Sequence, residues 1–391
     1  MNEKNRKVAF LLGLPLDVIG MDDTVADAVA HINARKPGYY ITANADFIAQ
    51  AYTNETLKDI LFHADRAVCD GMPLVWLSRY FKPELPERVA GSDMVFRLFD
   101  EAKKHNWKLY FLGSDERTLA RTSEILQEKY PGIQIVGTFS PPYGPVDSWP
   151  NDKILEKLKQ SQPDLLLVAV GCPKQELWIS RYHKESGVPL SIGIGASLDF
   201  ICGKQTRAPK FIQKIGMEWI WRMMTDPKRL IKRYAKDFYY LILLANRQRK
   251  LMRARRSSVQ DSGSISDKTP ISGKSEFAEQ PDTTSDTSGS VNHQFLSWEG
   301  SVEFGTVNEL PMPENYDSAI LLDLSQVTFI DSTGVGCLAK IARQARSANI
   351  TFALIQPSEI VKKIISAMHL EAQLPSFPDL RSGIDSLEKP S

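Results

Sequence analysis

The sequence predicts an α/β fold: a parallel sheet with helices on both faces, then a basic helical segment, then a second, smaller α/β domain. Three observations predict it. Short apolar runs alternate with longer amphipathic stretches up to about residue 194. Residues 204–256 are crowded with Lys and Arg, and residues 257–291 are rich in Ser, Thr, Asp and Gly. The 391 residues, 42% of them hydrophobic, suffice for two or three domains.

The strand and helix patterns alternate regularly in the first half of the chain. Strands are expected at 8–12, 39–43, 67–69, 108–112, 133–136, 165–170 and 190–194, and helices at 24–34, 47–52, 93–105, 119–130 and 153–160. This alternation is typical of a parallel sheet, whose ligands bind beyond the carboxyl ends of the strands.

Polar residues follow several of these predicted strands, and Asp70 is the most informative of them. In Cys69-Asp70-Gly71-Met72-Pro73 an apolar run ends on a carboxylate before a turn. A carboxylate held by a rigid strand can act as a general base. The alternative is a side chain that caps the next helix. A dinucleotide site is not supported, because Gly193-Ile194-Gly195 lacks a third glycine and lies at the last strand.

Composition excludes several other classes of site. The four Cys residues form no Cys-x-x-Cys pair and the six His residues no His-Glu-x-x-His motif, so we expect neither a metal centre nor a disulfide framework. The net charge of +1 is uninformative about partners. We expect no signal peptide, and the longest apolar run, 238–245, is too short to span a bilayer.

The basic segment, residues 216–256, is expected to be mostly helical, with a helix beginning at Asp226-Pro227. Its aromatic residues are interleaved with Lys and Arg, a composition typical of a helix lying in a membrane interface. Two alternatives stay open: a helix packed on the core with a solvated basic face, and a binder of single-stranded nucleic acid. The second ranks lower because no recognition module accompanies it.

The sequence predicts a flexible linker at 257–291, since its composition buries too little apolar surface to order itself. It separates a first domain, 1–250, from a second domain, 292–391. In the second domain we expect strands at 319–323 and 351–355 and helices at 335–348 and 358–368.

The first domain resembles the WecG/TagA/CpsF glycosyltransferases, glycosyltransferase family 26, over about residues 7–250. The segments that carry the resemblance are 41–46, 70–73, 87–93, 111–114, 171–176, 199–204, 207–210 and Glu218-Trp219. The resemblance implies a Rossmann-like domain that transfers a sugar, of the N-acetylmannosamine type or a related hexose. The donor would be a UDP-sugar and the acceptor a sugar on undecaprenyl diphosphate. The reaction would invert the anomeric centre without a metal or other cofactor, and the chain has no Asp-x-Asp pair.

The same resemblance assigns roles to individual residues. Asp70 matches the proposed base, and Arg88 matches an arginine suited to the diphosphate, with a surface salt bridge to Glu84 or Glu87 as its alternative. The remaining substrate-binding matches are Thr42, Asn44 and Gln175, each of which also suits a turn or cap, together with the appendage candidates Arg222, Arg229 and Arg233. Asp46, where the family often has Glu, stays outside the catalytic set.

The C-terminal domain resembles a STAS domain through Leu322-Asp323-Leu324-Ser325 and the segment 329–336. In the anti-sigma-factor antagonists of that family, the serine that matches Ser332 is phosphorylated by a partner kinase. The alternative is that Ser332 caps the helix that starts near Gly334.

These observations combine into one interpretation and its rivals. We expect a bacterial enzyme, peripheral on the cytoplasmic face of the cell membrane, that extends a lipid-linked oligosaccharide for a surface polysaccharide. A kinase or regulatory protein at the STAS domain and a second copy of the chain remain open as partners, whereas nucleic acid is not expected. The rivals are an inactive transferase fold that serves as a scaffold and a soluble nucleotide-sugar enzyme such as an epimerase.

Overall fold

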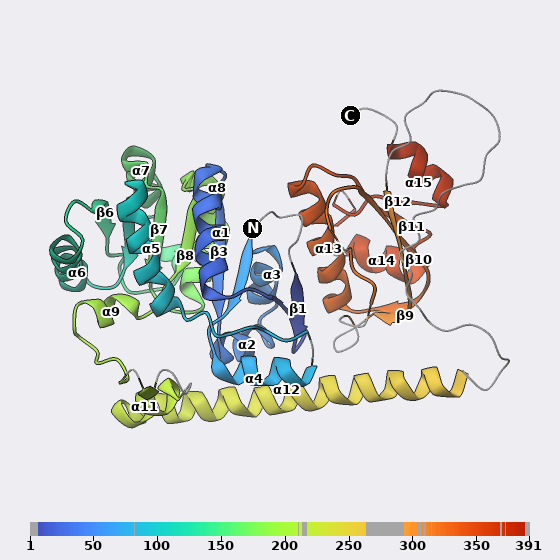
Figure 1. Cartoon of the computed structure of the whole chain (residues 1–391), viewed down its shortest axis with the longest axis horizontal. Coiled ribbons are helices and arrows are strands. Elements are labelled where there is room, and N and C mark those ends of the chain that lie inside the picture. The colour runs from blue at the N-terminus through green and yellow to red at the C-terminus, as the bar shows by residue number, and fades with distance from the viewer. Residues whose placement is uncertain are drawn as a thin grey trace. The chain divides into compact units, whose positions relative to one another are not determined.

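The structure is a computed structural model that describes residues 7–81, 83–209, 211–212, 217–262, 293–302, 307, 310–313, 315–367, 370–371 and 373–387. The chain divides into two compact units (Figure 1). Residues 7–243 form the first unit, residues from 244 onward belong to the second, and each is described by itself.

The first unit contains the predicted parallel sheet. Its six strands lie in the order β4-β3-β8-β7-β5-β6, and every neighbouring pair is parallel. Their bounds are β3 (Gly38–Ala43), β4 (Arg66–Cys69), β5 (Lys108–Gly113), β6 (Gln134–Phe139), β7 (Leu165–Ala169) and β8 (Leu190–Gly193). Strand β7 is an apolar run without alternation, since both of its faces are buried. The α/β prediction is therefore confirmed.

The strand predicted at 8–12 does not belong to this sheet. β1 (Val8–Leu11) pairs antiparallel with β2 (Leu14–Asp17) through a turn in which Leu12 and Gly13 both have positive φ, 53° and 79°. Such a turn matches the twist of a two-residue hairpin, but its usual signal is Asn-Gly or Asp-Gly. The sequence Leu-Gly carries no such signal, and the hairpin was therefore missed.

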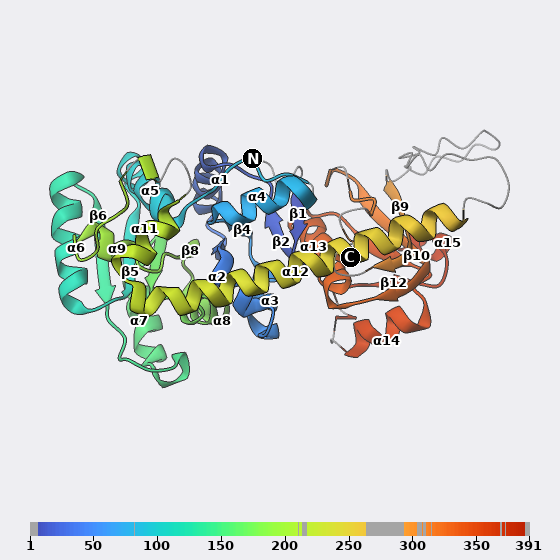
Figure 2. The ribbon, with the colours of Figure 1, turned by 90° about the horizontal axis from the view of Figure 1, so that it is seen from below.

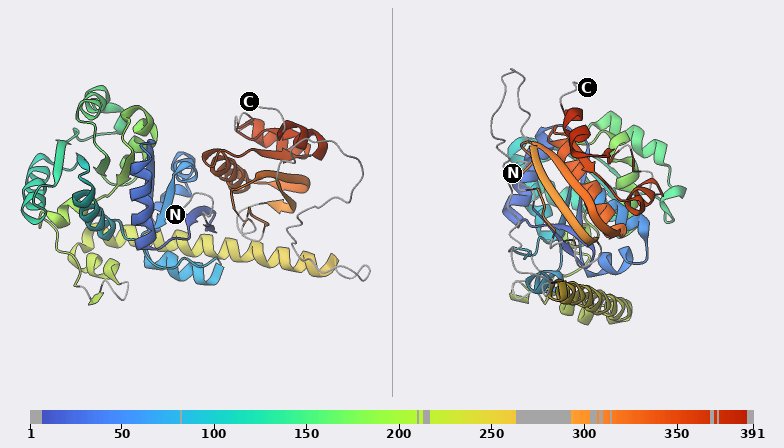
Figure 3. Two further views of the ribbon diagram at one scale, coloured as in Figure 1. Left: turned by 45° about the horizontal axis from the view of Figure 1, so that its top comes forward. Right: turned by 90° about the vertical axis from the view of Figure 1, so that its right-hand side faces the viewer.

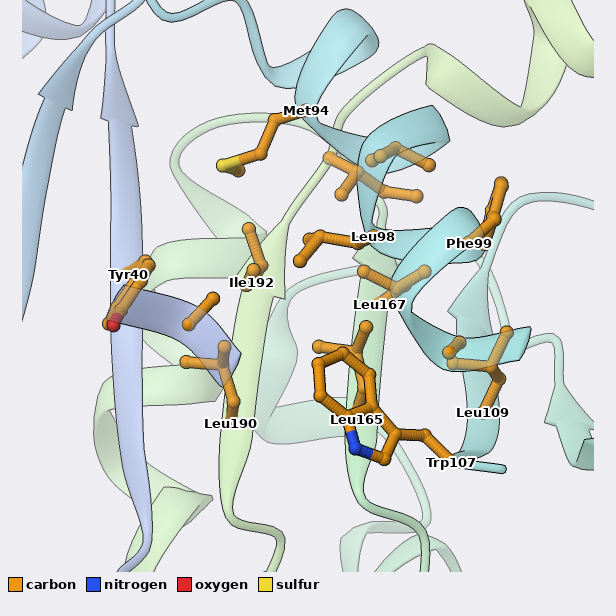
Figure 4. Close-up of a cluster of buried hydrophobic side chains, with 14 of the residues drawn as sticks. Tyr40, Met94, Leu98, Phe99, Trp107, Leu109, Leu165, Leu167, Leu190 and Ile192 are labelled. Atoms are coloured by element: carbon orange, nitrogen blue, oxygen red, sulfur yellow. The ribbon is translucent and has the colours of Figure 1, made fainter. Parts of the chain in front are cut away.

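Helices cover both faces of the parallel sheet. One face carries α1 (Met21–Asn33), α5 (Gly91–His105), α6 (Glu116–Lys129) and α9 (Ser197–Ile201); the other carries α8 (Lys174–Ser186), beside α3 (Glu55–His63) and α7 (Asn151–Ser161). Figure 4 shows Leu98 and Phe99 of α5 over strand residues such as Leu167 and Ile192, all of them buried. All five predicted helices are confirmed, within a few residues at their ends.

The basic segment is helical, as predicted, in α11 (Glu218–Thr225) and α12 (Pro227–Ser262). α2 (Ala45–Ala51) and α4 (Met72–Phe81) follow β3 and β4 at the carboxyl edge of the sheet. The first half of α12 lies below α2 in Figure 1 and passes in front of it in Figure 2. The rings of Tyr52 and Tyr240 lie 5.6 Å apart. α12 continues through 257–262, the first residues of the predicted linker, and 263–291 lie outside the described residues.

The second unit is a four-stranded parallel sheet in the order β12-β11-β10-β9 (Figure 3). Its elements are β9 (His293–Val302), β10 (Ala319–Ile330), α13 (Ser332–Ser347), β11 (Phe352–Ile355), α14 (Glu359–Ala367), β12 (Ser376–Phe377) and α15 (Leu380–Leu387). The predicted strands and helices are all found, but β10 runs seven residues beyond the predicted end at 323. Its extension pairs with β9 across two register shifts, which break the strand pattern in the sequence.

Candidate functional site

A cavity of about 770 Å³ lies at the carboxyl edge of the first unit's sheet. It is lined by residues that follow β3, β4, β7 and β8 and by residues of α11 and α12. Its size is that of a small-molecule site, and its position is where parallel sheets bind ligands. The predicted site residues that line it are Thr42, Asn44, Asp70, Arg88, Gln175, Arg222 and Arg233. The side chain of Arg229 lies outside the described residues.

Asp70 faces this cavity from the end of β4. Its Oδ2 accepts a hydrogen bond at 3.1 Å from the backbone N of Gly91, which is the first residue of α5. A Cβ at position 91 would lie 3.3 Å from Cγ2 of Thr42 and 3.6 Å from Asp70 Oδ2, so a glycine permits this approach. The side chain therefore does not make the predicted alternative contact with the following helix α4, whose first turn bonds to the backbone O of Gly71.

The surroundings of Asp70 make it a weaker acid than usual. Burial raises its pKa to about 6, although the nearby Arg88 and Arg222 and the Gly91 hydrogen bond act in the opposite direction. Glu218 also raises the pKa. A carboxyl that is ionised near neutral pH but is still basic enough to take a proton has the properties of a general base.

Glu218 connects the two arginines of the cavity. Its Oε2 lies 3.1 Å from Nη1 of Arg88, and its Oε1 lies 2.8 Å from Nη2 of Arg222. Burial opposes ionisation of Glu218, but Arg222 and Arg88 outweigh it and lower the pKa. Arg222 also stacks on Phe200, with 4.9 Å between the guanidinium and the ring centroid.

The alternative contact of Arg88 is not made. Its ion pairs are with Glu218 and, at 3.5 Å, with Asp93. Glu84 pairs with Arg79 instead, and Glu87 accepts from the backbone N of Met21. Glu218 belongs to a segment that carries the family resemblance, but it was not predicted as a site residue. Its position beside Trp219 in that segment was the feature that could have identified it.

The neutral residues of the site mostly shape the strand ends. Oε1 of Gln175 accepts from the backbone N of Gly171 at 3.2 Å and of Gly195 at 3.0 Å, which ties the ends of β7 and β8 together. Asn44 caps α2 through Phe47 N at 3.0 Å, as its alternative interpretation predicted. Oγ1 of Thr42 reaches the backbone O of Gly193 at 3.5 Å.

Another part of the cavity lining is acidic. Asp46 of α2, Glu176 of α8 and Asp237 of α12, here called the carboxyl wall, line it together with Cys172. Glu176 and Asp237 are 3% and 2% exposed. Burial, followed by the charge of Asp46, raises the pKa of Asp237 to about 7, and burial also raises the pKa of Glu176. The sequence analysis did not predict this set.

Two absences hold for the described part of the chain. Among those residues, no group of three or more His, Cys, Asp or Glu side chains is arranged to hold a metal ion. None of the described helices is long and apolar enough to cross a membrane.

Comparisons with known proteins follow the same division of the chain. Residues 9–256 match the glycosyl transferase WecG/TagA/CpsF family, and residues 268–383 match the STAS domain. The chain is 30% identical over 216 residues to the N-acetylglucosaminyldiphosphoundecaprenol N-acetyl-beta-D-mannosaminyltransferase of Bacillus spizizenii, a match that covers 54% of this chain and 81% of that protein. The protein of the same name from Staphylococcus aureus is 28% identical over 217 residues, 56% of this chain and 83% of its own.

The raised pKa of Asp70 predicts a pH-dependent stability difference. Between pH 4 and 6 the unfolded chain ionises Asp70 and the folded chain resists it, so ionisation destabilises the fold as the pH rises. The melting temperature of Asp70→Asn should match that of the wild type near pH 4 and exceed it near pH 7. The gain corresponds to at most about 3 kcal/mol.

Asp115→Asn is the control of opposite sign. Hydrogen bonds from Lys204 and Thr118 lower the pKa of Asp115. The melting temperature of this variant should therefore not rise above that of the wild type as the pH increases. Equal pH profiles for Asp70→Asn and the wild type would contradict the raised pKa.

Proposed function

Because the chain belongs to the WecG/TagA/CpsF glycosyltransferase family, we propose that it transfers a sugar from a UDP-sugar to a sugar carried on polyprenyl diphosphate. The donor sugar is of the N-acetylmannosamine type or a related hexose. The names of the relatives support the transferred sugar and the lipid-linked acceptor, since they combine an N-acetyl-mannosaminyl group with an undecaprenol-linked acceptor. The product is a lipid-linked oligosaccharide for a surface polysaccharide.

The observation that carries this proposal is the placement of Asp70 beside a pair of arginines in one cavity. The acceptor hydroxyl attacks C1 of the donor sugar from the face opposite UDP, which inverts the anomeric centre. As the new C–O bond forms, the hydroxyl proton passes to Asp70 and the bond between C1 and the UDP oxygen breaks. The electron pair of that bond leaves with the diphosphate.

The leaving diphosphate gains negative charge, which needs cationic or hydrogen-bonding partners. Arg88 and Arg222 both line the cavity, and each carries a guanidinium that can bind two phosphate oxygens at once. Two such groups supply the positive charge that other transferases take from a divalent ion, and we therefore propose a metal-independent reaction. Arg233, also on the cavity lining, is the third candidate for an anionic group.

Asp70→Asn tests the base. The variant should bind UDP within about threefold of the wild type but lose at least about a hundredfold in kcat, the usual contribution of a general base. In the wild type, kcat/KM should rise with pH through about 6 and then level off, since Asp70 acts ionised. The assay follows transfer from a panel of UDP-sugars to a short-chain polyprenyl-diphosphate-linked N-acetylglucosamine.

Asp147→Asn, an exposed carboxylate paired with Arg181, is the matched control and should keep wild-type turnover. Wild-type kcat in Asp70→Asn would remove Asp70 from the base role. A wild type that binds UDP but transfers no sugar from the whole panel would favour the inactive scaffold instead.

We propose further that α12 holds the enzyme on the cytoplasmic face of the membrane. Ile231, Tyr239 and Ile242 are 52%, 62% and 61% exposed, and their spacing places them on one side of the helix. Lys228, Lys232 and Lys236 are exposed as well. An apolar row flanked by lysines suits the surface of an anionic bilayer.

Replacing Ile231, Tyr239 and Ile242 together by Ser should reduce co-sedimentation with anionic vesicles at least tenfold, because the apolar row then has little to insert. Transfer to a soluble short-chain acceptor should not change, whereas transfer to an acceptor embedded in vesicles should fall. Tyr143→Ser, a fully exposed aromatic residue far from α12 in sequence, is the control. Undiminished sedimentation of the triple variant would rule out this surface as the anchor.

The chain carries a STAS domain, and we propose that this domain regulates the transferase or recruits a partner through Ser332. α13 begins at Ser332, and Asp331 caps it by accepting from the backbone N of Thr333 at 2.8 Å and of Gly334 at 3.0 Å. The cap is therefore Asp331, and the alternative role of Ser332 as the cap was wrong. A phosphate on Ser332 would add about −1.5 to −2 charges beside this carboxylate.

Ser332→Asp and Ser332→Ala should differ, because only the first places a negative charge at the start of α13. We expect at least a twofold difference in transfer rate on vesicles or in the protein partners captured by affinity purification. Both variants should melt within a few degrees of each other. Identical transfer and identical partner sets would remove Ser332 as a switch.

A further inference from the structure

The carboxyl wall contains buried groups whose hydrogen-bonding capacity the described residues leave unused. Neither carboxylate oxygen of Asp237 makes a hydrogen bond of good geometry with those residues, nor does Oε2 of Glu176. Asp46 lies close enough to share a proton with Asp237, and the Cys172 thiol lies beside Glu176. The other oxygen of Glu176 accepts from Nε2 of Gln175 at 2.8 Å. Oδ2 of Asp46 accepts from Nε2 of Gln50 at 3.1 Å. The negative charge of Asp46 raises the pKa of Asp237.

Such groups are costly to the fold. A buried carboxylate without donors loses the hydrogen bonds that water would give it. Asp237 and Glu176 are at least 97% buried, and yet both line an open cavity of about 770 Å³. Both residues line the cavity, but their unpartnered oxygens have almost no accessible surface, so a ligand supplies the missing donors once these side chains turn toward it.

The charge of the wall restricts the ligand. Arg88 and Arg222 supply positive charge beside Asp70, whereas the carboxyl wall is negative apart from the neighbouring Arg233 and Lys236. A diphosphate is attracted to the arginines and repelled by the carboxyls. The ligand of the wall must therefore be neutral and rich in O–H and N–H donors, which are the properties of a sugar ring. With a pKa of about 7, Asp237 is also protonated in part of the molecules and then donates as well.

We propose that Asp46, Glu176 and Asp237 form the subsite for the neutral sugar ring of the lipid-linked acceptor and accept hydrogen bonds from its hydroxyl and amide groups. This inference rests on the proposed function and adds the residues that recognise the acceptor. It assigns the acceptor rather than the donor sugar because Asp237 belongs to α12. That helix also presents the exposed row of Ile231, Tyr239 and Ile242, where a lipid-carried sugar would arrive.

The decisive variants are Asp237→Leu and Glu176→Gln. Asp237→Leu removes a costly buried carboxyl from a helix, so its melting temperature should equal or exceed that of the wild type. Both variants should weaken binding of a short-chain polyprenyl-diphosphate-linked N-acetylglucosamine at least tenfold, the loss expected for one charged hydrogen bond. The affinity for UDP, measured by calorimetry, should stay within about twofold. Asp147→Leu, on the surface, is the matched control and should change neither affinity.

Analogues of the acceptor test the hydrogen bonds directly. The wild type should discriminate against acceptors that lack one hydroxyl or in which the N-acetyl group is replaced by a hydroxyl. In the variant that has lost the corresponding carboxylate, the ratio of the affinities for the full acceptor and for the analogue should fall towards one. The reason is that the protein partner of the missing group is already absent. This ratio does not depend on how much of each preparation is folded.

Four results would overturn the subsite. The first is an acceptor affinity that is unchanged in both variants, and the second is a loss of UDP affinity as large as the loss of acceptor affinity. The third is discrimination against every analogue at the wild-type value, and the fourth is wild-type acceptor binding that EDTA abolishes and Mg²⁺ restores. The proposed function fails separately: a wild type that transfers nothing but binds the acceptor probe through these carboxyls leaves the subsite standing. If both variants transfer sugar with the acceptor KM of the wild type, the subsite is excluded but the proposed function is not.

Discussion

The ion-pair bridge of Glu218 is the interaction on which the candidate site depends. One carboxylate from α11 binds Arg88, which precedes α5, and Arg222, which lies one turn further along α11. Without it, two guanidinium groups would face one partly buried cavity and repel each other. Arg88 and Arg222 lower the pKa of Asp70 and Glu218 raises it, which connects the appendage to the proposed base.

The parallel sheet explains why these groups meet. β4, β3, β8 and β7 are neighbours, so the residues that follow them emerge at one edge in a continuous row. Gln175 fixes part of that row by accepting from the backbone N of Gly171 and of Gly195. Side chains held by strand ends and helix termini keep their geometry better than those on free loops. The edge therefore provides the rigid half of the site, and α11 and α12 provide the other half.

The sequence predicted the parts of this arrangement that local pattern encodes. The inner strands of the parallel sheet were recognisable because both of their faces are buried, and Asp70 was recognisable because it ends such a run. The hairpin of β1 and β2 was not, since Leu12-Gly13 lacks the usual turn residues. Glu218 and Asp237 escaped for a different reason. Asp237 lies in a helix rich in Lys and Arg and looks like a solvated surface charge in the sequence. Glu218 is shown to be buried only by contacts such as the one with Arg88, 130 residues away.

The three buried carboxyls of the cavity point to a common principle. Burial raises the pKa of Asp70, Glu176 and Asp237, so each costs the fold stability at neutral pH. Glu218, by contrast, is stabilised by its two arginines and its pKa is lowered. A carboxyl that the fold satisfies can serve as a structural bridge, whereas one that it leaves unsatisfied is free to bind a proton or a ligand's donors. We propose on this basis that Asp70, Glu176 and Asp237 act on substrate and that Glu218 holds the cations that act with them.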